Sequence, residues 1–301
     1  MALAAAALIG AALLWSGGTV LVRALRDTMP PMGLGFWRAV VALVLVLPFA
    51  AGALWRDRRL LWAEAPRLVV AGLCGVALFP VVFFLAVHNT EAINVGLVSA
   101  SEPLVIALLA WLALGDRLGR GQIGGFVVGA AGVIVLVTKG EPARVIDLAI
   151  GPGDAFAVAS LFVWGVYTVL VQRLPRALAP GAVLAAVFAA GLVFAAPFAV
   201  VEAATRPVVL TPASATVVLY SAAGGALLAF AFWNFGARVL GPTRAGFFLY
   251  LIPVFTFALA VALLGEPVRP YHGVGAAAIA LGVAIATRAP PGRRRVPAGP
   301  P

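Results

Sequence analysis

Two ionisable side chains lie inside long apolar stretches of the sequence, and they are the first residues that could do chemistry. Glu102 is about ten residues into the apolar segment 92–114, and Arg38 is early in the apolar segment 33–53. If the first of these segments is a helix that crosses a bilayer, Glu102 lies about 15 Å deep. Placing such a carboxylate in a membrane costs roughly 2.5–3.5 kcal/mol on insertion scales. Glu102 therefore indicates a functional site.

Two roles are open for Glu102. Burial in a medium of low dielectric favours the neutral, protonated form of a carboxyl group, and a group that exchanges a proton suits proton-coupled transport. The alternative is a structural ion pair with Arg38, which is at a suitable depth in the neighbouring apolar segment. A paired carboxylate would stay charged, and proton coupling through it would then be disfavoured.

Aromatic and small polar side chains form a second group of candidates. Rings combined with a few hydrogen-bonding groups make a site for an amphipathic ligand. The same rings would also serve in core packing or in an aromatic belt at the membrane interface. The candidates are Trp15, Ser16, Thr19, Phe83, Ser99, Trp164, Tyr167, Trp233, Asn234 and Tyr250.

Other chemistries are disfavoured by what the sequence contains. Its only histidines are His88 and His272 and its only cysteine is Cys74, so a His/Cys metal cluster is not expected. No GxxxxGK[ST] phosphate-binding loop occurs. We therefore predict no enzyme activity, no metal, no cofactor and no ATP-driven transport.

The elements that must hold these residues are membrane helices. The chain has 301 residues, of which 63% are hydrophobic and 11% are charged, whereas soluble domains usually have about 25% charged residues. A bilayer core needs roughly 20 apolar residues per helix. We predict an all-α integral membrane protein with ten such helices, at 3–24, 33–53, 67–88, 92–114, 121–138, 154–172, 181–202, 215–237, 244–264 and 271–288.

The second half of the chain repeats the first. Positions that match 150 residues apart are Gly96 and Gly246, Pro103 and Pro253, Gly115 and Gly265, and Asp116 and Glu266. Positions that match 149 residues apart are Trp15 and Trp164, Pro31 and Pro180, and Pro48 and Pro197. The counterpart of Glu102 is Ile252, so the repeated architecture does not itself require the carboxylate.

Five helices per half is an odd number, so the second half must enter the membrane from the opposite side. We predict a five-plus-five repeat of inverted topology, an arrangement that places substrate sites between the two units near the middle of the bilayer. The predicted parts are the first unit at 1–146, the second at 147–290 and a disordered cytoplasmic tail at 291–301.

The net charge of +10 fits a membrane topology and does not require a nucleic-acid partner. If the chain begins inside the cell, 14 of the 21 basic residues fall on the cytoplasmic side, as the positive-inside rule expects. We therefore predict that both termini are cytoplasmic.

Small residues recur every four positions at Gly121, Gly125 and Gly129, a spacing that lets another helix approach closely. We expect this stripe to pack within the monomer, with a homodimer interface as the alternative. Asp116 and Glu266, each just after a glycine, are expected to cap their helices or to form gate contacts.

The combination of these features resembles the drug/metabolite transporter superfamily, EamA family, over about residues 3–288. The similar features are the Trp15-Ser16 pair, the early basic residue Arg38, the Glu102-Pro103 pair, and the LGD and LGE sequences that close the fourth and ninth segments. The resemblance implies ten helices, cytoplasmic termini and export of small metabolites such as amino acids or of toxic organic compounds. It also implies that the aromatic candidates line a central cavity.

We therefore expect a secondary transporter of the cell inner membrane that exports a small organic metabolite by alternating access. Amino acids, aromatic ones first, are the leading substrates. A multidrug or nucleoside exporter is the alternative within transport, and a non-transporting membrane scaffold is the alternative outside it. A sugar-phosphate carrier is disfavoured because it would need several Lys or Arg side chains in the cavity, where only Arg38 is available.

Overall fold

A computed structural model describes residues 1–24, 30–141, 143, 151–206, 209 and 211–290. The predicted tail at 291–301 lies outside these residues, as does most of the connector between the two predicted units.

The prediction of ten membrane helices in an all-α protein is confirmed. In the described part of the chain the regular structure is helical, and ten helices are long and apolar enough to cross a membrane. Six of them begin at a proline, which lacks the N–H that a first helical turn leaves unsatisfied in any case. The ten spans are Ala2–Leu21, Pro31–Arg56, Ala65–Asn89, Ile93–Leu114, Arg120–Val137, Pro152–Arg173, Pro180–Ala203, Pro212–Leu240, Pro242–Leu264 and Pro270–Arg288.

Several spans consist of more than one helical element. The first half contains α1 (Ala2–Ala24), α2 (Pro31–Arg56), α3 (Arg58–Ala63), α4 (Ala65–Gly72), η1 (Leu73–Leu78), α5 (Phe79–Asn89), α6 (Ala92–Ser99), α7 (Glu102–Leu114) and α8 (Arg120–Val137). The second half contains α9 (Pro152–Arg173), α10 (Pro180–Ala203), α11 (Pro212–Tyr220), η3 (Ser221–Leu228), α12 (Ala229–Leu240), α13 (Pro242–Gly246), η4 (Phe247–Tyr250), α14 (Leu251–Leu264) and α15 (Pro270–Arg288).

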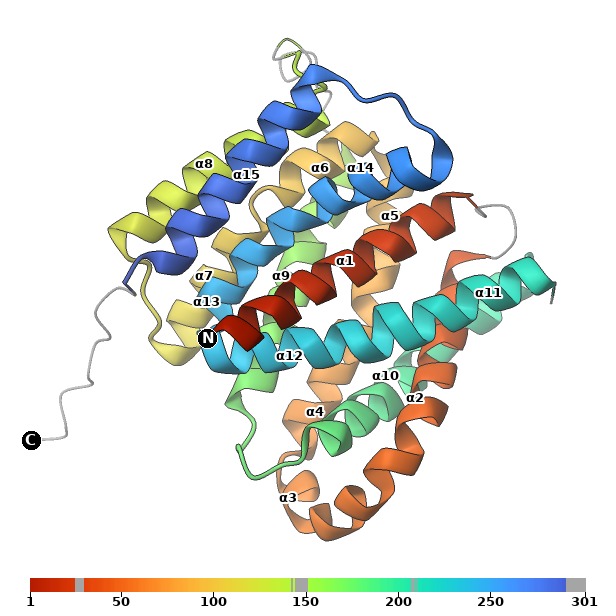
Figure 1. Ribbon diagram of the computed structural model, residues 1–301. Helices are drawn as coiled ribbons and strands as arrows, with labels where there is room; N and C mark the ends of the chain where they lie inside the picture. Colours follow the sequence, from red (N-terminus) through yellow and green to blue (C-terminus); the bar gives the residue numbers. More distant parts are fainter. Residues whose placement is uncertain (25–29, 142, 144–150, 207–208, 210, 291–301) are drawn as a thin grey trace, which may run out of the picture.

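The helices pack in matched pairs (Figure 1). Helix α8 lies beside α15 at one edge of the bundle, and α2 lies beside α10 at another. Between these pairs, α1 packs against α12 and α14, and α9 packs against α5 and α7. Helices α1 and α9 therefore have equivalent neighbours, and both lie in the middle of the bundle.

Departures from α-helical geometry also occur in pairs about 150 residues apart. The third and eighth spans each contain a π-helical segment, η1 and η3. The fourth span is interrupted between α6 and α7, and the ninth contains the 3₁₀ segment η4 at the equivalent place. Such irregular turns loosen the regular ladder of backbone hydrogen bonds and often occur at functional sites.

The LGD and LGE sequences close α7 and α14 by the same geometry. Gly115 and Gly265 adopt left-handed φ values of 70° and 68°, which favour glycine because it has no Cβ. The backbone N–H of Asp116, the next residue, donates to the carbonyl of Ala110 at 3.3 Å. In the second half, the backbone N–H of Glu266 donates to the carbonyl of Ala260 at 3.4 Å. The expectation that the acidic positions take part in helix caps is therefore confirmed for their backbones.

The glycine stripe packs inside the chain. A Cβ on Gly125 would lie 2.6 Å from the backbone nitrogen of Ala286, and one on Gly282 would lie 2.5 Å from the backbone nitrogen of Gly129. Helices α8 and α15 therefore touch through their backbones, as small residues allow in membranes. Of the two expectations for this stripe, packing within the monomer is the one observed.

Candidate functional site

Aromatic side chains from α1, α9 and α12 meet in the middle of the bundle. The rings of Trp15 and Trp164 are 5.4 Å apart in an edge-to-face arrangement, and Trp233 lies 5.8 Å from both. Phe230 packs edge-on against Trp164 at 5.4 Å. Edge-to-face pairs place the positive edge of one ring on the negative face of another, which stabilises the cluster beyond its burial.

Hydrogen bonds hold the buried rings of Tyr167 and Trp233 in place. Tyr167 and Trp233 are almost completely buried. The Tyr167 hydroxyl lies 3.0 Å from Oδ1 of Asn234, and Nε1 of Trp233 donates to the hydroxyl of Thr168 at 3.2 Å. These bonds join α9 to α12 and satisfy polar groups that water cannot reach.

Two predicted site residues beside the cluster are exposed, Phe83 on α5 and Thr19 on α1. Phe83 is 39% exposed and stacks on Phe79, which in turn lies 5.2 Å from Trp164. Trp15 is half-buried. Thr19, one turn further along α1, is exposed, and its hydroxyl donates to the carbonyl of Trp15. Phe83 and Thr19 are therefore the exposed members of the predicted site.

The two π-helical segments support the cluster at equivalent positions. The carbonyl of Gly225 in η3 accepts a hydrogen bond of 2.9 Å from Nε1 of Trp15. Its counterpart Gly75 in η1 leaves space for the ring of Tyr167, because a Cβ there would lie 2.6 Å from the ring. The sequence comparison alone did not reveal the π-helical geometry of these glycine positions.

Side chains from other helices bind the backbone beside the helix breaks. The Tyr250 hydroxyl donates to the carbonyl of Ala100 at 2.7 Å, and the Ser16 hydroxyl lies 2.9 Å from the carbonyl of Ile252. Ala100 and Tyr250 occupy matching positions in the two halves. The carbonyl of Ala100 at the first break is therefore satisfied by protein, as the absence of water in a bilayer requires.

Glu102 is the first residue of α7 and follows the break directly. It is half-buried, and Tyr250 lies within electrostatic range of its carboxyl group. Ser99 is half-buried at the end of α6, on the other side of the break. The break thus places a carboxyl group and a hydroxyl group close together within a membrane span.

Glu102 and Arg38 do not form an ion pair in the described part of the chain. Arg38 is half-buried on α2, one turn after Gly35, where an added Cβ would lie 3.9 Å from the Cβ of Pro80 in α5. The structural-pair alternative for Glu102 is therefore not observed. The carboxyl group and the guanidinium group each stay available for another partner.

Two hydrogen bonds connect helices of the two halves at the end of the bundle where the chain begins. The Thr243 hydroxyl donates to Oδ2 of Asp116 at 3.3 Å, which joins the end of α7 to α13. Arg173 at the end of α9 donates to the carbonyl of Ala113 in α7. Asp116 therefore joins the two halves through its side chain in addition to its backbone cap.

Most of the predicted site residues are brought together. Trp15, Phe83, Trp164, Tyr167, Trp233 and Asn234 form or adjoin the aromatic cluster, whereas Ser16, Ser99, Glu102 and Tyr250 lie at the breaks. Arg38 has no contact with either group among the interactions of the described residues. Sequence reasoning missed Phe79, Phe230 and Thr168, although the first two lie one helical turn before Phe83 and Trp233. Within the described residues, no three His, Cys, Asp or Glu side chains are grouped to hold a metal ion.

Comparison with known proteins identifies the family. The model of the EamA-like transporter family matches the chain twice, over residues 2–138 and 151–288. The chain belongs to the EamA-like transporter family. It is therefore a multi-pass membrane transporter embedded in a lipid bilayer, as the resemblance in the sequence implies.

Relatives of this EamA-family chain cover almost its whole length. An uncharacterized transporter, YyaM, of Bacillus subtilis (strain 168) is 26% identical over 265 residues, 85% of this chain and 84% of that protein. A probable terminal-alkyne amino-acid exporter of Streptantibioticus cattleyicolor is 29% identical over 290 residues, 96% of this chain and 95% of that protein. A solved crystal structure covers 94% of this chain and 96% of its own with a TM-score of 0.73 at 24% identity, which supports the fold.

Proposed function

We propose that this EamA-family protein is a secondary transporter that exports amino acids, with aromatic ones as the leading substrates, across a bacterial inner membrane. The observation that carries the proposal is the aromatic cluster of α1, α5, α9 and α12, which Phe83 extends to an exposed position. Polar groups at the helix breaks border α1, which supplies Trp15 to this cluster. This combination suits an amphipathic solute.

The two charged groups have the signs of charge that the two ends of a zwitterion require. Glu102 would attract the ammonium group of an amino acid, and Arg38 would attract its carboxylate, which a planar guanidinium binds in a bidentate way. Both lie in membrane spans without an ion-pair partner among the described residues. The relative from Streptantibioticus cattleyicolor, named as a probable amino-acid exporter, supports this substrate class.

Alternating access would follow from an inverted repeat of the units 1–146 and 147–290. The double match to the family model supports two equivalent units, as do the equivalent neighbours of α1 and α9. Exchange of conformation between such units opens a central site to each side in turn. The closed end at Asp116 and Thr243 would then be one of two gates.

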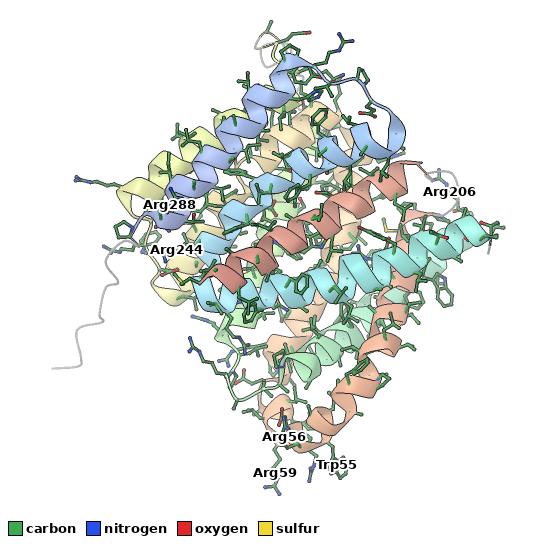
Figure 2. All side chains as sticks on the ribbon, viewed as in Figure 1. Trp55, Arg56, Arg59, Arg206, Arg244 and Arg288 are labelled. Carbon is green, nitrogen blue, oxygen red and sulfur yellow. The ribbon has the colours of Figure 1, made fainter. Side chains whose placement is uncertain are left out.

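Both termini are proposed to be cytoplasmic. In Figure 2, Arg244 and Arg288 lie at the end of the bundle where the chain begins, and Arg56 and Arg59 lie at the corner between α2 and α3, whereas Arg206 is at the opposite end. An excess of arginine at the first end fits the positive-inside rule. The test is a fusion, after Arg288, of a reporter enzyme that works only outside the cytoplasm. Activity of this fused reporter would refute the orientation.

The function is tested by flux measurements in proteoliposomes. A panel of labelled aromatic and aliphatic amino acids, nucleosides and cationic drugs is assayed with and without a pH gradient, for the wild type and for Glu102→Gln. We expect gradient-driven flux of aromatic amino acids that is lost in the variant. Unchanged flux in a folded Glu102→Gln protein would show that this carboxyl group is not the coupling group.

The aromatic cluster is tested by a matched pair of tryptophan substitutions. Trp164→Leu removes a ring that contacts Trp15, Phe79 and Phe230, and we expect at least a tenfold loss of flux for aromatic substrates. Trp62→Leu is the control, because this ring is 80% exposed on α3. Equal effects of the two substitutions would contradict a binding role for the cluster.

Export of a cationic drug is the second candidate function. This function is favoured by the carboxyl group of Glu102, which has no ion-pair partner among the described residues. Aromatic rings and a carboxyl group both attract organic cations. In the flux panel, drug transport that is insensitive to Arg38→Gln would support this candidate over amino-acid export. No flux of any compound would instead support a scaffold function.

A further inference from the structure

A groove runs along one face of α7. It encloses about 610 Å³. Its lining is almost entirely apolar and consists of Ser101, Leu104, Val105, Ala107, Leu108, Trp111, Arg117 and Leu118. Most of these residues are three or four positions apart, so they share one face of the helix.

This face is directed toward the bilayer. Leu108 and Trp111 are 41% and 46% exposed, although α7 crosses the membrane. The opposite side of α7 packs on α13, where a Cβ on Gly246 would lie 3.3 Å from Pro103 and 3.5 Å from Ile106. Because the protein is embedded in lipid, the groove is open to hydrocarbon chains along its length.

The length of the groove matches one leaflet. Helix α7 has 13 residues, which rise about 20 Å, and the hydrocarbon of one leaflet is about 15 Å thick, half of the bilayer core. The groove begins at Ser101, beside the helix break, and ends at Arg117, just beyond the end of the span. A chain attached to a headgroup at Arg117 would therefore reach the level of the break.

The end of the groove carries a positive charge. Arg117 is half-buried, and its guanidinium has no hydrogen-bond or ion-pair partner in the described part of the chain. A guanidinium binds phosphate through two parallel hydrogen bonds. Trp111 lies near this end, and tryptophan prefers the level of lipid headgroups.

We propose that the α7 groove is a binding site for an anionic glycerophospholipid, with one acyl chain on the apolar face and the phosphate on Arg117. The site depends on the location of the protein in a bilayer and is independent of the transported substrate. The lipid would cover an apolar surface that ends at Ser101, next to Glu102. A bound lipid would therefore contact the residues at the helix break.

The test is lipid retention by the purified, delipidated full-length protein, measured by native mass spectrometry after addition of phosphatidylglycerol. We expect Arg117→Gln to weaken retention about tenfold. Leu108→Trp, which fills the groove, should weaken it to a similar degree. Arg120→Gln is the matched control, because Arg120 is exposed nearby and does not line the groove.

Further arms separate the possible occupants. Phosphatidylcholine should be retained less than phosphatidylglycerol, and soluble glycerol phosphate should not compete. The proposal is overturned if Arg120→Gln weakens retention as much as Arg117→Gln does, or if Arg117→Gln has no effect. It is also overturned if Leu108→Trp converts a dimer into a monomer, since the groove would then hold a second copy of the chain.

Discussion

Two adjacent glycines in α8 should respond in opposite ways to the same substitution. Gly125 is buried against α15, and a Cβ there would lie 2.6 Å from the backbone nitrogen of Ala286 and 2.7 Å from the carbonyl oxygen of Gly282. These are backbone atoms, so the two helices must separate to admit the methyl group. The position of Gly124 is exposed, and a Cβ there meets nothing within 4 Å.

The expected magnitudes follow from this geometry. Overpacking a close contact costs typically about 1–3 kcal/mol, so Gly125→Ala should destabilise the protein by that amount. Gly124→Ala should stabilise it by about 0.5–1 kcal/mol, because alanine loses less backbone entropy than glycine in a helix. The two neighbouring variants should therefore differ by about 1.5–4 kcal/mol.

The assay is unfolding in mixed micelles with increasing detergent denaturant, followed by tryptophan fluorescence. The buried rings of Trp164 and Trp233 report the loss of packing in the aromatic cluster. If Gly125→Ala is as stable as Gly124→Ala, helices α8 and α15 do not touch through their backbones. The reasoning about the glycine stripe would then be wrong.

Two further predictions concern the hydrogen bonds of one side chain each. Tyr250→Phe loses a buried hydrogen bond to a main-chain carbonyl and should lower the free energy of unfolding by about 0.6–1.7 kcal/mol. Tyr271→Phe is the control, because the Tyr271 hydroxyl has no such bond in the described structure, and it should lower this free energy by less in the same assay. The pKa of Asp57 lies below its ordinary value because its carboxylate accepts hydrogen bonds from Arg56 and from the backbone N–H of Ala179. Its contribution to stability is therefore fully present above about pH 4 and is lost as the pH falls through the lowered pKa. Thermal unfolding from pH 6 to pH 3 should show this loss in the wild type and not in Asp57→Asn, and parallel curves for the two proteins would contradict the role of this carboxylate.

Much of the fold could be predicted from the sequence because its signals are local. A bilayer requires long apolar helices, so the ten spans follow from composition and length. Gly115 and Gly265 indicated the ends of two helices, because a left-handed residue favours glycine. Pro103 and Pro253, which match in the repeat, each lie within a few residues of an irregular segment. Each of these properties is decided within one or two helical turns.

The site was predicted only in part because its contacts join distant parts of the chain. The repeat related Trp15 to Trp164 in the sequence, but the bond from Trp15 to Gly225 depends on the π-helical geometry of η3. The sequence left open whether Glu102 pairs with Arg38, because helix depth alone does not fix which way a side chain turns.

The sequence by itself determined the class of protein, the number of spans and the positions of the helix ends, since the bilayer imposes length and hydropathy on each segment separately. Only the tertiary structure decided which rings form the cluster, that Glu102 and Arg38 are not paired with each other, and that a groove on α7 ends at Arg117. These outcomes depend on how helices rotate and pack against one another. Helix rotation is set by many weak contacts between distant residues, and it leaves little trace in the local sequence.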